Sequence, residues 1–287
     1  MYRLATAFII VAALSSVNAK AQQTSQTRTI VNNMMDAIKK AKGYTYVMRG
    51  SEKYIGKKEF KVTDLYTKVN NSPRKVFARV ENEPNKGTEM LYGEGERDGK
   101  IQVKAGRFIP GVKLSPFSGL LTKDQHHTLL SAGFMFVWKV INDGVKRAEA
   151  QKGFDQVFKY VGDVTFNGKK CYKIVVEDPT YAITTYTAKK GETLYSIAQK
   201  LLVPEYNIME MNGLKGFDDD LGGKVLKVPT SFAKKSVLFI DKENNFPIYQ
   251  EMGDNNGIFE KYEYSNLVIN PAFAEDEFTT DFKDYHF

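Results

Sequence analysis

The stretch from residue 183 to residue 231 places two helical patterns between two strand patterns, and it constrains the fold more than any other part of the chain. Residues 184–188 alternate in the way a strand does. Thr193 can then cap a helix through its hydroxyl group. The apolar stripe of that helix is formed by Leu194, Ile197, Ala198 and Leu201. A second short helix ending at Asn212 and Gly213, and a closing strand at 225–228, complete the pattern.

This order of residues resembles a LysM module, a small βααβ family whose loops hold N-acetylglucosamine-containing glycans such as peptidoglycan or chitin. The resemblance implies a groove between the loop after the first strand and the loop after the second helix. The glycan-binding residues that it implies are Gly191, Glu192, Thr193, Leu194, Asn212, Gly213 and Leu214. Glu192 stands where the family usually has aspartate, and residues 223–224 stand where it usually has Gly-Gln. The alternative is that the glycines and capping residues of this set only cap and turn the chain.

The N-terminus predicts export. Met1 and Arg3 precede an apolar run, residues 4–14, that is far shorter than the roughly 20 residues needed to span a bilayer. Residues 19–21 follow as a small-x-small cleavage site. We therefore expect a signal peptide at residues 1–21, a mature chain that begins near Gln22 with no transmembrane segment, and a periplasmic protein associated with the cell wall.

A single cysteine, Cys171, excludes an intrachain disulfide even in an oxidising compartment. Stability must therefore come from a buried core, which 287 residues with 42% apolar composition can supply. Cys171 lies in a strand-like run, residues 170–177, where we expect a buried and inert thiol rather than a nucleophile.

The strand patterns on the two sides of the predicted LysM module belong to one meander. Residues 173–177 precede the module. Two strand patterns, residues 236–240 and 246–251, follow the module and are separated by a tight polar turn. Because the ends of a LysM module lie close together, such a module can be inserted into a surface hairpin. After the signal peptide, we expect a β domain in two parts, 22–182 and 232–287, separated by a LysM domain at 183–231.

The host of this insertion is predicted to be an α+β domain, mainly antiparallel, with two helices. Apolar residues recur at helical spacing from Ile30 to Ala41 and predict a helix over about 26–42. A second helix is expected to begin at a capping-box pattern, residues 122–125, and to continue to Val145. Alternating patterns predict strands at 44–50, 53–70, 74–81, 87–94, 100–103 and 158–164. A long curved sheet wrapped around helices is implied.

This host domain resembles the LolA-like fold, the half-open β-barrel of periplasmic lipoprotein carriers, over residues 26–182 and 233–287. The resemblance depends on Tyr66, on the segments 239–247 and 259–267, on Asn270 and Pro271, and on the aromatic residues Phe278, Phe282, Tyr285 and Phe287. Carriers of that family hold acyl chains inside an apolar barrel, so acyl chains or a lipoprotein are the ligands that the resemblance implies. A barrel filled by its own side chains is the alternative.

The charge pattern adds one further indication about partners. The formal net charge is +7, the predicted LysM segment is balanced, and the tail 275–287 is acidic, so the positive charge lies on the host domain. Such a field favours anionic envelope surfaces, whereas solvated lysines on outward strand faces are the alternative. Because export is predicted, nucleic acid is not expected as a partner.

No enzymatic activity and no cofactor are expected. The histidines are His126, His127 and His286. Adjacent histidines in the first turn of a helix point about 100° apart, which is poor geometry for binding one metal ion. No Gly-x-Ser-x-Gly motif is present, and the cysteine lies within a strand pattern. We expect His126 and His127 to cap their helix or to line the mouth of the barrel. Because a glycosidase needs only two carboxylates, a peptidoglycan hydrolase stays as the weakest alternative.

The sequence therefore predicts an exported, non-enzymatic envelope protein that binds peptidoglycan glycan strands through an inserted LysM domain and presents a LolA-like domain. In one alternative, the host is a periplasmic carrier of lipid or lipoprotein and the LysM domain is its anchor. In another, the host is an adaptor that binds an envelope protein through its sheet edge or its acidic aromatic tail. An apolar cavity would favour the carrier, and a filled barrel would favour the adaptor.

Overall fold

The computed structural model describes residues 26–106, 109–151 and 153–287. The predicted signal peptide at 1–21 and the predicted start of the mature chain lie outside these residues. Within the described ranges, the protein has no helix with both the length and the apolar character that crossing a bilayer requires.

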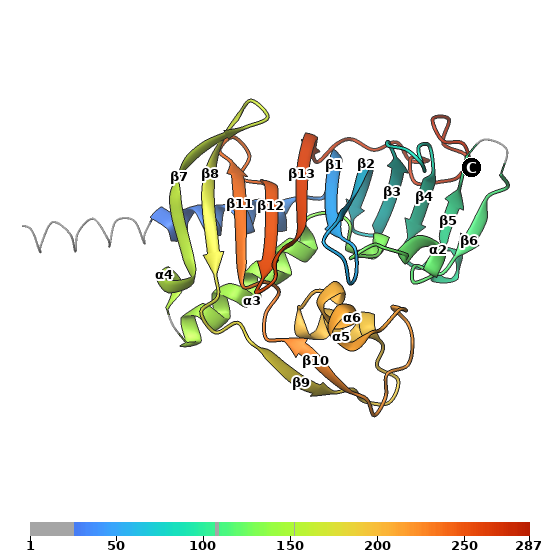
Figure 1. Ribbon diagram of the computed structural model, residues 1–287. Helices are drawn as coiled ribbons and strands as arrows, with labels where there is room; N and C mark the ends of the chain where they lie inside the picture. The colour runs from blue at the N-terminus through green and yellow to red at the C-terminus, as the bar shows by residue number, and fades with distance from the viewer. Residues whose placement is uncertain (1–25, 107–108, 152) are drawn as a thin grey trace, which may run out of the picture.

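Eleven strands form one antiparallel sheet in the order β6-β5-β4-β3-β2-β1-β13-β12-β11-β8-β7 (Figure 1). The strands are β1 (Gly43–Lys53), β2 (Phe60–Asn71), β3 (Arg74–Val80), β4 (Glu89–Gly93), β5 (Ile101–Lys104), β6 (Val112–Leu114), β7 (Phe158–Phe166), β8 (Lys169–Glu177), β11 (Lys235–Asp241), β12 (Pro247–Asp254) and β13 (Gly257–Ile269). The predicted α+β class and the mainly antiparallel sheet are confirmed. The order leaves β6 and β7 as edges, so the sheet is open.

Local sequence explains most of these strands and their turns. Asn167 and Gly168 both have positive φ between β7 and β8, as a tight hairpin turn requires. The strand predicted at 53–70 begins too early, because β1 continues to Lys53 and a turn at 54–59 separates it from β2. The short edge strand β6 was not predicted.

The two longest helices both pack into the main core of the sheet. The helix at residues 26–40 confirms the predicted first helix, and it buries Ile30, Met34 and Ile38. Helix α3 (Met135–Gln151) adds Ile141 and Ala148 to the same core. In Figure 1 both helices lie behind the half of the sheet that contains β7 to β13. A further short helix, α4 (Phe154–Val157), leads into β7.

The predicted start of the second long helix is wrong. The structure has a one-turn helix α2 (Gly119–Thr122) and a 3-10 turn η2 (Leu129–Ser131) before α3 begins at Met135. Asp124 has a φ of 58°, which a helix does not allow. The backbone N–H of His126 donates to the Glu52 carboxylate instead of to a helical carbonyl. A tertiary contact therefore overrides the local capping-box pattern.

Residues 183–229 form a separate unit between neighbouring strands of the large sheet. Strands β9 (Ile183–Thr187) and β10 (Val225–Pro229) pair with each other, and helices α5 (Leu194–Leu201) and α6 (Glu205–Asn212) lie between them in sequence. The order is strand, helix, helix, strand, and we call this segment the βααβ unit. Its own core includes Leu194, Ile197, Ile208, Phe217 and Leu226. Strands β8 and β11 pair directly, so the unit is an excursion from their hairpin.

The βααβ unit packs against the large sheet (Figure 1). The rings of Phe117 and Tyr195 lie 4.8 Å apart, and the Asn207 amide donates to Asp254. Tyr206, in the first turn of α6, is part of the main core of the sheet. The unit is therefore docked through buried side chains and does not hang on its two connections alone.

The aromatic C-terminal tail lies against the other face of the sheet. Val76 belongs to the main core, whereas its neighbour Phe77 belongs to a cluster formed with the tail, as alternation along β3 requires. Phe77 and Tyr285 stack with ring centroids 3.8 Å apart. Lys68 forms a largely buried ion pair with Glu277. These tail residues are bound to their own sheet, which weakens the prediction of a tail that is free to bind a partner.

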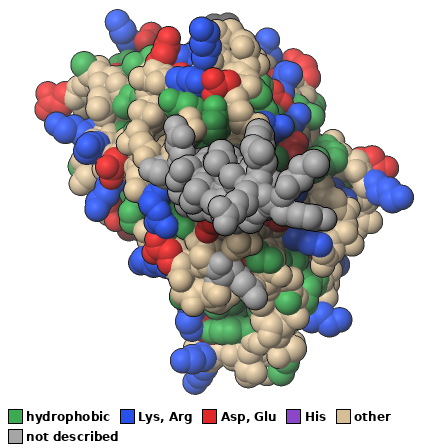
Figure 2. Space-filling model, turned by 90° about the vertical axis from the view of Figure 1, so that its left-hand side faces the viewer, with side chains coloured by type: hydrophobic (Ala, Val, Ile, Leu, Met, Phe, Trp, Pro, Cys, Tyr) green, Lys and Arg blue, Asp and Glu red, His purple; other side chains and the backbone are tan. Residues whose placement is uncertain are grey.

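The surface charge is mixed on the side of the molecule where β7 forms the edge of the sheet. Figure 2 shows Lys and Arg side chains spread over that face with Asp and Glu among them, and with hydrophobic side chains between. Strand faces with solvated lysines give this appearance. The positive net charge is therefore not gathered into one patch on that face.

Candidate functional site

A cavity of about 220 Å³ lies between the sheet, residues 116–133 and α3. Most of its lining side chains are apolar. Met48, Leu65 and Leu238 line it from the sheet, and Phe136, Val137 and Val140 line it from α3. The cavity favours the alternative of an apolar ligand space over that of a host filled by its own side chains.

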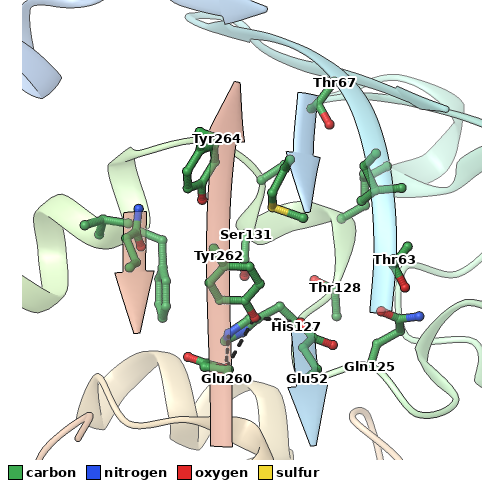
Figure 3. A pocket seen from close by; sticks show the side chains of 18 of the residues that line it. Glu52, Thr63, Thr67, Gln125, His127, Thr128, Ser131, Glu260, Tyr262 and Tyr264 are labelled. Carbon is green, nitrogen blue, oxygen red and sulfur yellow. Dashed lines mark hydrogen bonds and ion pairs between the residues drawn. The ribbon is translucent and has the colours of Figure 1, made fainter. Parts of the chain in front are cut away.

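Polar side chains gather at one end of this cavity. Figure 3 shows Glu52, His127 and Glu260 together there, with Gln125 beside them. Among the described lining residues, Glu52 and Glu260 are the carboxylates and His127 is the histidine, and none is Lys, Arg or Asp. The cavity thus has an apolar body and a polar end with acidic groups.

The register of two strands brings the two carboxylates together. Glu52 on β1 pairs with Glu260 on β13, and both side chains are buried. Like charges opposite each other destabilise a sheet unless other groups compensate them. Tyr262, two residues from Glu260 and therefore on the same face, donates its hydroxyl to Glu52 Oε1 at 2.6 Å and to Glu260 Oε2 at 3.3 Å.

His126 supplies part of that compensation. Its Nδ1 atom lies 3.0 Å from Glu260 Oε2, and its Nε2 atom lies 2.8 Å from the carbonyl oxygen of Lys53. A carbonyl only accepts hydrogen bonds, and so does an ionised carboxylate. Both ring nitrogens are therefore best satisfied when each has a proton, which makes the ring a cation. Tyr206 of the βααβ unit stacks on this ring at 4.1 Å.

His127 lies between two carboxylates that come from different parts of the molecule. Its Nε2 atom is 3.2 Å from Glu260 Oε2, and its Nδ1 atom is 3.2 Å from Oε2 of Glu205 on α6. Both are ion-pair distances. Glu205 is completely buried and occupies the first turn of α6, where the helix dipole favours a negative charge. We call Glu52, His126, His127, Glu205 and Glu260 the His–Glu cluster.

The electrostatics of this cluster follow from its contacts. Burial disfavours the charged form of His127, but Glu260 and Glu205 outweigh burial and hold the pKa of His127 well above its usual 6.5. The pKa of His126 is also raised, because the carboxylates of Glu260 and Glu52 outweigh burial. Burial alone would raise the pKa of Glu260, yet His127 and His126 lower it to about 2. An ionised Glu260 carboxylate paired with two imidazolium rings is the favoured state.

The cluster is not arranged as a metal centre. In the part of the chain that the structure describes, no group of three His, Cys, Asp or Glu side chains could hold a metal ion. The ring of His127 separates Glu205 from Glu260, so their oxygens do not converge on one point as metal ligands must.

The residues that the LysM resemblance implied for glycan binding have structural partners in the βααβ unit. Thr193 accepts from the backbone N–H of Ser196 in a capping box, and Leu194 is buried. Asn212 exchanges hydrogen bonds with the backbone of Lys227 and so fastens the end of α6 to β10. Gly213 ends α6 with a left-handed conformation.

The remaining implied residues also make local contacts. Glu192 forms an ion pair with Lys200, accepts from the Tyr186 hydroxyl, and has a pKa lowered to about 2, first of all by its bond to Lys200. Gly191 has a φ of 80° and donates to Asp220. Leu214 packs against the core of the unit. These contacts agree with the capping and turning alternative, and glycan binding stays a prediction.

Other sequence predictions have clear outcomes. His127 lines the cavity, in agreement with one of the expectations for it, whereas His126 is buried beside the cavity and caps no helix. Cys171 is buried in β8, and burial raises the pKa of its thiol to about 11, which confirms the expectation of a buried thiol. His286 binds Glu89 in the packed tail.

Sequence reasoning missed Glu52, Glu205 and Glu260. One usable signal was present, since Glu260, Tyr262 and Tyr264 alternate along β13 and must share a face. An acidic residue in register with two aromatic residues indicates a buried carboxylate. No local pattern marks Glu205, because its burial depends on how the βααβ unit docks.

A protein-family model described as a protein of unknown function, DUF1571, matches residues 41–208, which is more than half of the chain. The chain belongs to the DUF1571 family. The matched range of this DUF1571 protein includes Glu52, both histidines of the cluster and Glu205, and it ends before Glu260. The family match does not separate a LysM module from the rest of the chain. No curated protein matches the sequence.

Several solved structures are distantly similar. An uncharacterised conserved protein from Thermus thermophilus has 7% identity and a TM-score of 0.40, covering 91% of this chain and 96% of its own. The lipoprotein LppX of Mycobacterium tuberculosis has 11% identity and a TM-score of 0.41, with coverage of 87% and 98%. A LolA superfamily protein from Nitrosomonas europaea has 8% identity and a TM-score of 0.34, with coverage of 89% and 98%. These likenesses are too distant to assign a function.

Proposed function

We propose that this DUF1571 protein is a non-enzymatic binding protein of the cell envelope that holds the apolar part of one lipid or acyl chain in the cavity between the sheet and α3. The cavity is the observation that carries this proposal. Its walls are mainly aliphatic and aromatic, and its polar groups are gathered at one end. An amphiphilic molecule has the same division between an apolar body and a polar end. Localisation in the envelope is part of the proposal and follows from the N-terminal sequence pattern.

The size of the cavity limits the ligand. At about 220 Å³ it exceeds the roughly 150 Å³ of an apolar cavity that takes benzene, and it is smaller than the roughly 300 Å³ at which pockets for drug-sized molecules begin. It therefore suits part of one chain better than several chains. Burial of about six methylene groups would contribute roughly 5 kcal/mol before the cost of association is subtracted.

The groups at the polar end support binding rather than catalysis. Each ring nitrogen of His126 and His127 faces an acceptor, so neither ring offers a free base to a ligand. The thiol of Cys171 is buried in β8 and has a raised pKa. These observations favour a protein that holds its ligand without changing it.

A fluorescence titration with the neutral apolar probe N-phenyl-1-naphthylamine tests this proposal. We expect the protein to bind the probe and Leu65→Trp to bind it at least about tenfold more weakly, because the larger ring fills the space that the ligand needs. Val268→Trp is the matched control, since Val268 is half exposed on β13 and does not line the cavity. Equal binding by Leu65→Trp and by the control would refute the site, as would no binding by the unchanged protein.

Glycan binding by the βααβ unit is a second candidate function. Its support is the strand–helix–helix–strand order of the unit. The two loops of the predicted groove, after β9 and after α6, lie near the C-terminal end of β9. Leu214 is the suitable residue for a test, because Thr193 and Asn212 hold the fold of the unit. We expect Leu214→Asp to sediment less with purified sacculi than Ile183→Asp, whose side chain lies at the other end of β9. If neither the unchanged protein nor the variants sediment with sacculi, this function is excluded.

A further inference from the structure

The charge inside the cavity is opposite to the charge of the whole chain. The chain has a formal net charge of +7, yet no Lys or Arg is among the described residues that line the cavity. Its charged groups are Glu52, Glu260 and His127. A ligand in the cavity therefore meets two carboxylates beside one histidine, although the chain as a whole is basic.

The His–Glu cluster has more acid groups than basic groups. Glu52, Glu205 and Glu260 supply three carboxyl groups, and His126 and His127 supply two imidazoles, so the acid groups outnumber the basic groups by one. Oε1 of Glu260 is buried without a hydrogen-bond donor among the described residues, and the contact of Glu205 Oε2 is its ion pair with His127. The cluster thus has more acceptors than donors.

No neighbouring cation reverses this balance in the part of the chain that the structure describes. The guanidinium of Arg74 donates to the carbonyl oxygens of Leu130 and Ala132, and Arg74 is not a lining residue. Lys53 contributes its carbonyl oxygen to the cluster. The opposite end of the cavity offers Thr67 and Tyr264, which are uncharged (Figure 3). At the polar end the cation on the wall is His127, and its two ring nitrogens already face Glu260 and Glu205. At the other end no lining residue is a cation.

We propose that the cavity selects an amphiphile whose polar end is cationic or neutral and discriminates against one whose polar end is anionic, such as a fatty acid. This inference rests on the proposed function and specifies the ligand of the same site. In a partly buried site, charges are poorly screened, so a carboxylate or phosphate near Glu52 and Glu260 is disfavoured. An ammonium group is attracted, and a hydroxyl or ester group can bond to Gln125 and Thr128 on the cavity wall.

Competition between three probes with the same ten-carbon chain tests the inference. Decylamine, decanol and decanoate would each displace bound N-phenyl-1-naphthylamine from the full-length mature protein. At about pH 7 the amine is protonated and the acid is ionised. We expect decylamine and decanol to displace the fluorophore at concentrations about tenfold or more below that of decanoate, because only decanoate brings a like charge to the carboxylates.

A neutralising variant gives an independent check. Glu52→Gln keeps the shape of the side chain and removes one acid group from the lining. It should reduce the preference for decylamine and decanol over decanoate by several fold. Glu263→Gln is the control, because Glu263 lies on the opposite face of β13, pairs with Lys261 and does not line the cavity. If Glu52→Gln does not fold, the comparison of the three probes with the unchanged protein decides by itself.

Three contradicting outcomes can be told apart. Displacement by decanoate as good as that by decylamine would overturn the head-group inference and leave the proposed chain-binding site intact. Absence of binding by the fluorophore and by all three probes would overturn both. Equal preference in Glu52→Gln and in the unchanged protein would show that the carboxylates do not set the selectivity.

Discussion

Nδ1 of His127 lies 3.2 Å from a carboxylate oxygen of Glu205, and this contact joins the polar end of the cavity to the βααβ unit. His127 lines the cavity, whereas Glu205 begins α6. The two residues belong to different segments of the chain, and both are removed from water for the most part. Any ligand that changes the position or charge of His127 therefore changes a buried contact of the docked unit.

Removal of one partner from this contact should destabilise the protein strongly. We expect His127→Gln to lower the free energy of unfolding by about 3 kcal/mol, because Glu205 and Glu260 would remain buried without their shared cation. The double variant His127→Gln, Glu205→Gln should lose less than the sum of the two single variants. Urea denaturation measures all three. Glu243→Gln, which removes an exposed ion pair with Lys169, should cost less than about 1 kcal/mol.

Stability should depend on pH with a maximum between about 4.5 and 6.5. The raised pKa of His127 means that its contribution is complete below 6.5 and is lost as the pH rises through the folded-state pKa. The pKa of Glu260 is lowered from 4.5 to about 2, so its contribution is present above 4.5 and is lost as the pH falls toward 2. The groups that face these two residues are Glu205 on α6, Glu52 on β1, and His126 and Tyr262.

Thermal unfolding followed by circular dichroism across this pH range measures the dependence. His127→Gln should flatten the alkaline side of the profile and leave most of the acid side, because Glu260 still pairs with His126. An unchanged alkaline side in this variant would contradict the assignment.

Loss of the stacked ring in the C-terminal tail should weaken the opposite face of the sheet. Tyr285 stacks on the buried Phe77 and donates its hydroxyl to the carbonyl oxygen of Glu277 at 2.8 Å. We expect Tyr285→Ala to cost about 2–3 kcal/mol of unfolding free energy, somewhat less than a fully buried aromatic residue. Tyr285→Phe keeps the stack and should cost about 1 kcal/mol through its lost hydrogen bond. Equal effects of the two variants, measured by urea denaturation, would show that the stack contributes little.

Asn212 should matter for stability whether or not a glycan is present. Its side chain donates to the carbonyl oxygens of Ile208 and Lys227 and accepts from the Lys227 N–H. We expect Asn212→Ala to cost about 2 kcal/mol, since these backbone partners would lose their hydrogen bonds. Hydrogen exchange at the amide of Lys227 reports this loss directly. Thr184→Ala, on an exposed position of β9, is the control and should have little effect.

Much of the fold followed from local patterns. Alternation placed most strands of the large sheet close to their observed positions, and helical spacing placed the helix at 26–40. These patterns succeed because a residue's place on one face of a strand or helix depends on its near neighbours. The capping-box pattern at 122–125 failed because Glu52, far away in sequence, binds the His126 N–H that a helix would need.

The α+β class, the strand–helix–helix–strand order of residues 183–229 and the absence of an intrachain disulfide could be predicted from local residue patterns and composition. The cavity in the host, and the meeting of Glu52, Glu205 and Glu260 around two histidines at its end, became apparent in the folded chain alone. Strand order and the docking of α6 bring these carboxylates together. Because no local period encodes which distant segments become neighbours, the candidate site was invisible until the whole chain was packed.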